Sequence, residues 1–371
     1  MYAKGLTAAI LALAAQQAQA AKCYALAFSS GDESAAYQAG VLKGLAGSYD
    51  ASEMAYTAIS GISGGAINAA ILASFEAGQE GAAADRMSTF WTNASNSELY
   101  KNWLGGIAEG LLIKGGLYND SELLTFLKSD KGLNDVTPNK RWLDIGITDV
   151  LKGTYKDMHS EDLTGDNFYN TMYAEFAYAG FFPPVDAMGS EWFDGSTIWD
   201  LDIFSAVNKC VDDGFADTDI VVDVAMTSAK TLKVVDASSY KSIHMLWRYL
   251  EVSRYYSSMD GLLRAQFAYP NVTFRNIVSP SADLPSSLYP LNLKEADITT
   301  MVELGEKDAK ASAAAGPQSV NDTFHYYSLK KTQDNRIDGM SFDDFVAAKL
   351  NGLFGEYNLL EDKTMQNMFL Q

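Results

Sequence analysis

Histidine, cysteine and basic side chains are scarce in this chain of 371 residues, which has 3 histidines, 2 cysteines and 28 lysines and arginines. These few histidines and cysteines do not have the spacing of a zinc site. The 47 aspartates and glutamates bring the formal net charge to −19. This acidic excess argues against nucleic acid as a partner. An acidic protein is also not attracted to anionic membranes, so any contact with lipid would have to be made by apolar surface.

Long apolar runs are also missing. After the first twenty residues, no segment approaches the ~20 uncharged apolar residues that cross a bilayer, so we expect a soluble mature chain. Residues 1–20 contain Lys4, an apolar run over Leu6–Ala15, and the small-residue site Ala18-Gln19-Ala20. This three-part arrangement predicts a secretory signal peptide cleaved after Ala20, with an N-terminal helix of the fold as the alternative.

Two further features agree with export. Cys23 and Cys210 are an isolated cysteine pair, which predicts one disulfide in an oxidising compartment, with two buried free thiols as the alternative. Four segments fit the N-glycosylation acceptor pattern, at Asn93, Asn119, Asn271 and Asn321. Such segments also arise by chance, so they only support the expectation of a secreted protein or one held in a lysosome-like or vacuole-like endomembrane compartment.

Short apolar strands alternate with helices along the first part of the chain. The predicted strands are residues 23–31, 54–60, 176–185 and 220–228, and the predicted helices are 37–46, 66–78 and 201–214. This alternation predicts an α/β fold with a mostly parallel central sheet. After about residue 240 come two long helical segments, 244–267 and 295–316, around a strand-like segment, 274–280. With no linker or repeat, we expect residues 21–371 to form one domain.

The first candidate site is the run Gly61-Ile62-Ser63-Gly64-Gly65, which fits the pattern G-x-S-x-G between a predicted strand and a predicted helix. A nucleophile on a sharp strand-to-helix turn needs small residues two positions before and after it, which Gly61 and Gly65 provide. The start of the following helix directs N–H groups toward the serine oxygen, where negative charge develops in acyl transfer. The alternative is a glycine turn in which Ser63 only caps the helix.

A serine nucleophile needs a base. Asp194 follows two bulky aromatic residues and precedes Gly195, so we expect it to leave a short strand at a tight turn, with an ordinary Asp-Gly turn as the alternative. A Ser-Asp-His triad would need His244 or His325. We interpret both histidines as structural, because His244 begins a helical segment and His325 lies in a strand-like one.

Three segments resemble the patatin-like phospholipase family in order and spacing. They read LAFSSGDESAAYQAGVLKGL, SGISGGAINAAI and FFPPV…EWFDGS, and the similarity covers about residues 23–226. The resemblance implies a three-layer α/β/α fold that hydrolyses phospholipids or related lipid esters at a transient membrane or micelle surface. It also implies a Ser-Asp dyad without histidine, metal or other cofactor. Ser63 then attacks the ester carbonyl, Asp194 takes its proton, and water activated by Asp194 releases the acyl group.

The resemblance also suggests an oxyanion hole made by backbone N–H groups of Gly31, Asp32, Glu33 and Gly64. The first pattern of the family has three glycines and an arginine, whereas here only Gly31 remains and Ser34 stands where the arginine would be. Carboxylates beside the hole would oppose the developing negative charge unless they point to solvent. This departure keeps open a second hypothesis, a non-catalytic protein of the same fold that binds or stores lipid.

Overall fold

The computed structural model describes residues 22–334, so the predicted signal peptide lies outside the described residues. Its strands are β1 (Cys23–Phe28), β2 (Tyr56–Gly61), β3 (Lys101–Asn102), β4 (Tyr118–Asn119), β5 (Trp142–Asp149), β6 (Thr154–His159), β7 (Val185–Ala187), β8 (Ser190–Asp194), β9 (Ile220–Ala225) and β10 (Thr273–Val278). Its α-helices are α2 (Ala36–Ala46), α3 (Gly64–Ala73), α4 (Glu80–Ser95), α5 (Gly106–Leu112), α6 (Ser121–Leu127), α7 (Asp166–Ala174), α8 (Phe204–Asp212), α9 (Ser242–Ala268), α10 (Glu295–Ala315) and α11 (Pro317–Asp334). Three short 3₁₀ helices are η1 (Asp32–Ala35), η2 (Gly195–Thr197) and η3 (Asp217–Asp219). Within this described part, no helix combines the length and the apolar character that a membrane span requires.

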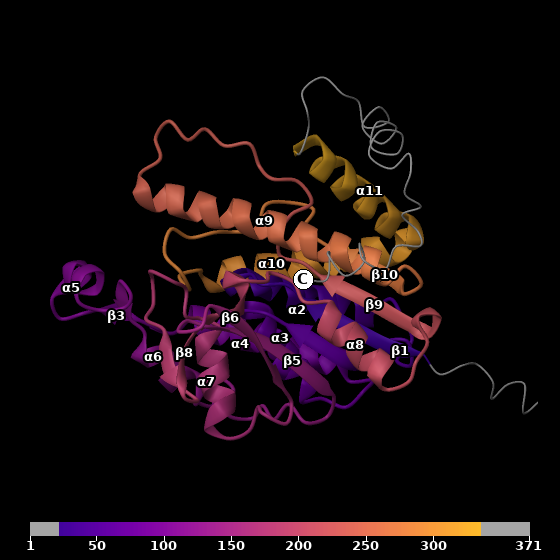
Figure 1. Ribbon diagram of the computed structural model, residues 1–371, viewed down its shortest axis with the longest axis horizontal. Helices are drawn as coiled ribbons and strands as arrows, with labels where there is room; N and C mark the ends of the chain where they lie inside the picture. The colour runs from indigo at the N-terminus through magenta and orange to yellow at the C-terminus, as the bar shows by residue number, and fades with distance from the viewer. Residues whose placement is uncertain (1–21, 335–371) are drawn as a thin grey trace, which may run out of the picture.

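Eight strands form the central sheet (Figure 1), in the order β10-β9-β1-β2-β5-β8-β7, with β6 paired to β5. The strands from β10 to β5 run parallel, whereas β6 and β8 run antiparallel to β5, and β7 runs antiparallel to β8. Because the parallel strands end at one edge of the sheet, the loops after β1 and β2 lie side by side there.

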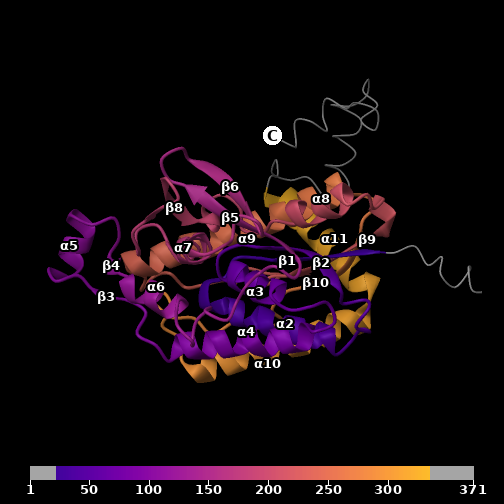
Figure 2. The ribbon, with the colours of Figure 1, turned by 90° about the horizontal axis from the view of Figure 1, so that it is seen from below.

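Helices cover both faces of the sheet (Figure 2), with α2, α3, α4 and α10 on one face and α8 and α11 on the other. The alternation of side chains along β1 shows why two cores form. Leu26 and Phe28 pack with the first group of helices, while Cys23, Ala25 and Ala27 pack with α8, α9 and α11. The predicted α/β/α fold with its mostly parallel sheet is therefore confirmed.

The C-terminal helices pack directly on this sandwich. Helix α10 crosses α2 at a distance that only glycine permits, because a Cβ atom at Gly40 would overlap the carbonyl oxygen of Val302. Gly305 on α10 approaches the backbone of Tyr37 in the same way. On the other face, Tyr255 and Met259 of α9 are buried in the second core.

One predicted strand is wrong and two other elements differ from the prediction. Residues 176–184 form turns and irregular backbone instead of a strand, and only Val185 belongs to a strand, as the first residue of β7. Phe181 and Phe182 both donate to the carbonyl of Tyr178, and the two prolines that come next cannot donate to a sheet. The aromatic side chains of this segment, at 176, 178, 181 and 182, are buried without being in a strand. Helix α3 ends at Ala73, five residues before the predicted end, and the strand-like segment around His325 belongs to helix α11.

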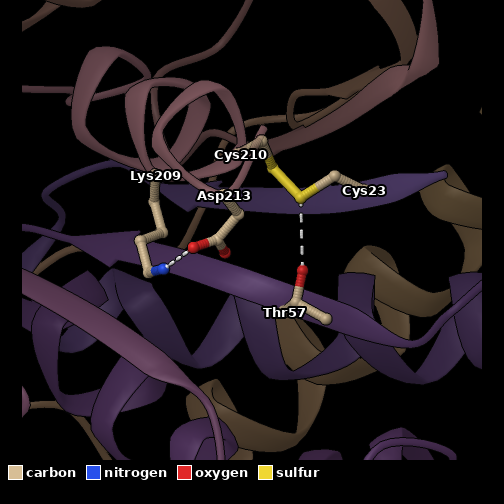
Figure 3. Close-up of a disulfide and its surroundings, with 5 residues drawn as sticks. All are labelled: Cys23, Thr57, Lys209, Cys210 and Asp213. Atoms are coloured by element: carbon tan, nitrogen blue, oxygen red, sulfur yellow. Dashed lines mark hydrogen bonds and ion pairs between the residues drawn. A yellow bond between two sulfur atoms is a disulfide. The ribbon is translucent and has the colours of Figure 1, made fainter. Parts of the chain in front are cut away.

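A disulfide joins Cys23 of β1 to Cys210 of α8 (Figure 3), across 187 residues of sequence. Both cysteines are buried, and the Sγ atom of Cys23 also lies 3.3 Å from the hydroxyl of Thr57 on β2. The bond therefore fastens α8 to the middle of the sheet.

Replacing both cysteines with serine is expected to lower the free energy of unfolding by about 2–5 kcal/mol, because the covalent link restricts the unfolded chain over a long loop. Urea denaturation of the wild type and of Cys23→Ser/Cys210→Ser measures the difference. Wild type unfolded in the presence of a reducing agent is the matched control and should behave like the variant. Equal urea midpoints for oxidised wild type and variant would contradict the prediction.

Candidate active site

Ser63 lies on the sharp turn between β2 and α3, with φ 59° and ψ −131°. A positive φ is uncommon for a residue with a side chain and marks local strain. The flanking glycines make the turn possible, because a Cβ atom at Gly61 would overlap the backbone of Gly65, and one at Gly65 would overlap the carbonyl oxygen of Ser29. The turn is therefore not a simple helix cap, and no side-chain capping bond comes from Ser63.

Asp194 ends β8, where it pairs with Ile147 of β5. Its Oδ1 atom accepts a hydrogen bond of 2.7 Å from the N–H of Ser196, while Oδ2 is buried without a hydrogen-bond partner among the described residues. Gly195 is required at this turn, because a Cβ atom there would overlap the carbonyl oxygen of Gly146. The turn thus leaves one carboxylate oxygen of Asp194 free to accept a proton.

Burial raises the pKa of Asp194 to about 7. The guanidinium of Arg254, the N–H of Ser196 and the hydroxyl of Ser63 each act to lower it, and the carboxylate of Asp32 acts to raise it. An ordinary aspartate has a pKa near ~3.9 and is a weak base. A pKa near neutrality is the range in which general bases work best at physiological pH.

Glu175 is a third member of this centre, and the sequence analysis missed it. Its Oε2 atom accepts a hydrogen bond of 2.5 Å from the N–H of Ser63, and the N–H of Gly195 acts to lower the pKa of the same carboxyl group. The hydroxyl of Ser63 makes a long bond of 3.4 Å to the carbonyl oxygen of Glu175. Burial and the neighbouring Asp194 raise the pKa of Glu175 well above its usual value. One side chain therefore links the serine turn to the aspartate turn.

The predicted oxyanion residues lie at the starts of two helices. Asp32 and Glu33 begin η1, and Gly64 begins α3, where N–H groups have no partner within the helix. Gly64 packs so closely on the carbonyl of Asp32 that a Cβ atom would overlap it, so the two helix starts are in contact. Asp200 holds the loop in place, because it accepts hydrogen bonds from the N–H and the hydroxyl of Ser30.

The two carboxylates of this loop are not free charges. Arg254 of α9 binds Asp32 with both ends of its guanidinium, at 2.7 and 3.0 Å. Glu33 instead accepts a hydrogen bond of 2.8 Å from the N–H of Leu291, and burial together with Asp32 raises its pKa to about 7. The structure thus brings an arginine beside the loop from another part of the chain, although Ser34 occupies the loop position itself.

Two cavities meet this centre, and α9 separates them. One, of about 650 Å³, is lined by Asp194, Tyr178 and Trp199, and the other, of about 580 Å³, is lined by Gly31 and the residues that follow it. Trp247 and Arg254 of α9 line both. Ser63 itself is fully buried, and the two cavities approach it from the side of Asp194 and from the side of the Gly31 loop.

The histidines do not join Ser63 and Asp194. His159 of β6 lies 3.3 Å from Asp144, His244 accepts a hydrogen bond from the N–H of Lys241 at the start of α9, and His325 is exposed on α11. No hydrogen bond or ion pair found among the described residues joins a histidine to the centre.

A group of three carboxylates could hold a cation. Asp144, Asp157 and Asp202 bring one oxygen each within 4.8 Å of one another. However, the oxygens of Asp202 already accept bonds from the N–H and hydroxyl of Ser205, and burial raises the pKa values of Asp144 and Asp202. Ser205 thus satisfies Asp202, whereas both oxygens of Asp144 are buried without a hydrogen-bond partner among the described residues. We assign the group no ion.

The sequence model of the family described as patatin-like phospholipase matches residues 26–206, a span that includes Ser63 and Asp194. A search of curated proteins finds no match. Among solved structures the chain is similar to the crystal structure of VipD from Legionella pneumophila, with 13% sequence identity and a TM-score of 0.37, over 94% of this chain and 79% of that chain. Residues 26–206 therefore form a patatin-like phospholipase domain, a match that supports lipid acyl hydrolase activity in general.

Proposed function

We propose that this protein is a serine hydrolase that cleaves acyl esters of phospholipids or related lipids through a dyad of Ser63 and Asp194. The most direct support is the Oδ2 atom of Asp194, which is buried and has no hydrogen-bond partner among the described residues. The hydroxyl of Ser63 also acts to lower the pKa of this carboxyl group. The strained turn at Ser63 is a second support, because strain of this kind persists where the surrounding structure enforces it and is common at active sites.

In this mechanism Asp194 accepts the proton of Ser63 as the serine oxygen attacks the ester carbonyl. The N–H groups at the starts of η1 and α3 stabilise the negative charge on the carbonyl oxygen. The protonated Asp194 then gives its proton to the leaving alcohol, and a water molecule deprotonated by Asp194 hydrolyses the acyl-enzyme. Arg254 neutralises Asp32, which removes the charge that would otherwise oppose the oxyanion.

Two alternatives remain as competing hypotheses. A protein that only binds or stores lipid has no physical need for a strained serine between glycines whose Cβ atoms cannot be accommodated. A Ser-Asp-His triad needs His244 or His325 beside Asp194, but His244 accepts a hydrogen bond from Lys241 at the start of α9 and His325 is exposed on α11. Both arguments favour the dyad.

A fluorophosphonate probe tests the proposal, because it reacts with activated serines. We expect the purified protein to be labelled, with mass spectrometry locating the adduct on Ser63, and to release fatty acid from a fluorescent phospholipid. Heat-denatured protein is the control for non-specific labelling. A protein that is neither labelled nor active on several lipid esters would favour the lipid-binding hypothesis.

We also propose that the chain is exported to an oxidising compartment, secreted or within the endomembrane system. The buried disulfide supports this, because such bonds are rare in a reducing cytosol. Among the predicted glycosylation sites, Asn271 and Asn321 are exposed, whereas the side chain of Asn93 donates to the carbonyl of Lys131. Expression in a secretory host, followed by glycosidase treatment, tests both expectations.

A further inference from the structure

Residues 103–117 form a projection that we call the α5 knob. It contains helix α5 and stands on a two-stranded stem, in which β3 and β4 pair antiparallel with Asn102 opposite Tyr118. Both views of the molecule place α5 at one end, beyond the body of the sandwich (Figures 1 and 2).

The α5 knob presents its large apolar side chains to solvent. Each of these five is more than half exposed, and they lie within ten consecutive residues: Leu104, Ile107, Leu111, Leu112 and Ile113. Exposed apolar residues scattered singly are ordinary on a protein surface, but a contiguous group marks a site of contact with another apolar surface.

The polar groups of the α5 knob are bonded to one another. The indole N–H of Trp103 donates to the carbonyl of Gly116 at 3.0 Å, and Glu109 accepts from the N–H of Gly105 at 2.7 Å. Lys114 lies 3.5 Å from Glu109 and 4.9 Å above the ring of Trp103. Its two charged side chains therefore pair, and the knob has no net charge in a chain of net charge −19.

The stem of the α5 knob packs against the segment that contributes Tyr178 to the wall of the Asp194 cavity. Tyr118 donates its N–H to the carbonyl of Phe181, and the ring of Phe182 contacts both Tyr118 and Tyr178. Tyr178 lines the Asp194 cavity, and Phe181 stacks on Trp247 of α9, which lines it too. Buried aromatic contacts thus connect the base of the α5 knob to the wall of the Asp194 cavity.

We propose that the α5 knob inserts its apolar side chains into the surface of a zwitterionic lipid aggregate and holds the active-site cavity against that surface. This inference rests on the proposed function, which already requires a substrate that exists as membranes or micelles. Insertion of a neutral, apolar element suits a zwitterionic surface, whereas the acidic body of the protein is repelled by an anionic one. The half-buried Trp103 at the base of the knob provides an amphipathic ring of the kind that favours the membrane–water boundary.

Vesicle flotation tests this inference directly. The Ser63→Ala protein is mixed with phosphatidylcholine vesicles, so that hydrolysis does not consume them, and the bound fraction is measured with and without the further change Leu111→Asp/Leu112→Asp. We expect this change to weaken binding at least about tenfold, because two leucine side chains no longer enter the apolar layer. We expect Leu151→Asp, at a similarly exposed leucine in the β5–β6 turn, to leave binding unchanged. Vesicles that contain phosphatidylglycerol should bind less protein.

Activity separates this inference from the proposed function. With Ser63 present, Leu111→Asp/Leu112→Asp should keep wild-type kcat and KM on a water-soluble short-chain ester and lose activity only on vesicles. Equal vesicle binding by the variant and the parent protein would overturn the inference while the proposed function stands. Sedimentation velocity without lipid provides a second check, since a wild-type dimer that the double change converts to monomer would assign the α5 knob to self-association and overturn its role at lipid. Absence of hydrolysis of any ester would instead overturn the proposed function.

Discussion

We expect replacement of Asp194 with Asn to lower kcat for ester hydrolysis by about 10²–10⁴-fold, the range for loss of a general base. The amide oxygen can still accept the hydrogen bond from Ser196, so the turn after β8 is preserved. What is lost is the free oxygen that takes the proton of Ser63. Replacing Ser63 with Ala costs at least as much, because no nucleophile remains. Initial rates on a soluble ester, with circular dichroism to check the fold, measure both losses.

The pH dependence gives a second readout of the same change. Since the pKa of Asp194 is raised to about 7, its carboxyl group is largely protonated at pH 5 and cannot act as a base. Wild-type kcat should therefore rise with pH and reach half its maximum near pH 7, whereas the residual activity of Asp194→Asn should lack this step. His325→Ala is the control and should follow the wild-type curve. A loss of activity in His325→Ala with full activity in Asp194→Asn would rule out the dyad.

Ser63 and Asp194, the residues of the proposed dyad, could be selected from the sequence because the signals around them are local. The glycines around Ser63 and after Asp194 are required by backbone contacts within a few residues or with a neighbouring strand, and such requirements leave a readable spacing. Strands such as β1 and β9 were likewise predicted from short apolar runs between turn residues. The segment 176–185 was wrongly predicted as a strand because its buried aromatic side chains form a short apolar run of the kind that strands have.

Glu175 and Arg254 were not predictable, because their roles depend on contacts between distant segments. The bond from Ser63 to Glu175 spans 112 residues, and the ion pair between Asp32 and Arg254 spans 222. Nothing in the residues around Arg254, which lies within a 27-residue helix, indicates that its guanidinium reaches the loop after β1. The sequence alone shows that the loop after β1 departs from the family pattern. It does not show that Arg254 compensates for this departure by binding Asp32.

That compensation makes Arg254 the second residue whose loss should have a large effect. Arg254→Met leaves the carboxylate of Asp32, which is 7% exposed, without its partner. Because breaking a buried ion pair from one side is strongly destabilising, we expect the free energy of unfolding to fall by about 3 kcal/mol. The pKa of Asp194 should also rise, since Arg254 lowers it and the unpaired Asp32 raises it. The rising part of the kcat profile should therefore move to higher pH, and activity at pH 7 should fall.

A double variant distinguishes the loss of this charge balance from a loss of packing. Asp32→Asn/Arg254→Met removes both charges, so it should recover most of the stability and return the pH profile toward that of the wild type. Arg264→Met is the matched control, because Arg264 lies on the same helix and lines the same cavity but is exposed. If Arg254→Met and the double variant are equally unstable and share one pH profile, Arg254 stabilises the protein through packing alone. Recovery in the double variant means that the chain can dispense with the loop arginine of its family because α9 places a guanidinium on Asp32.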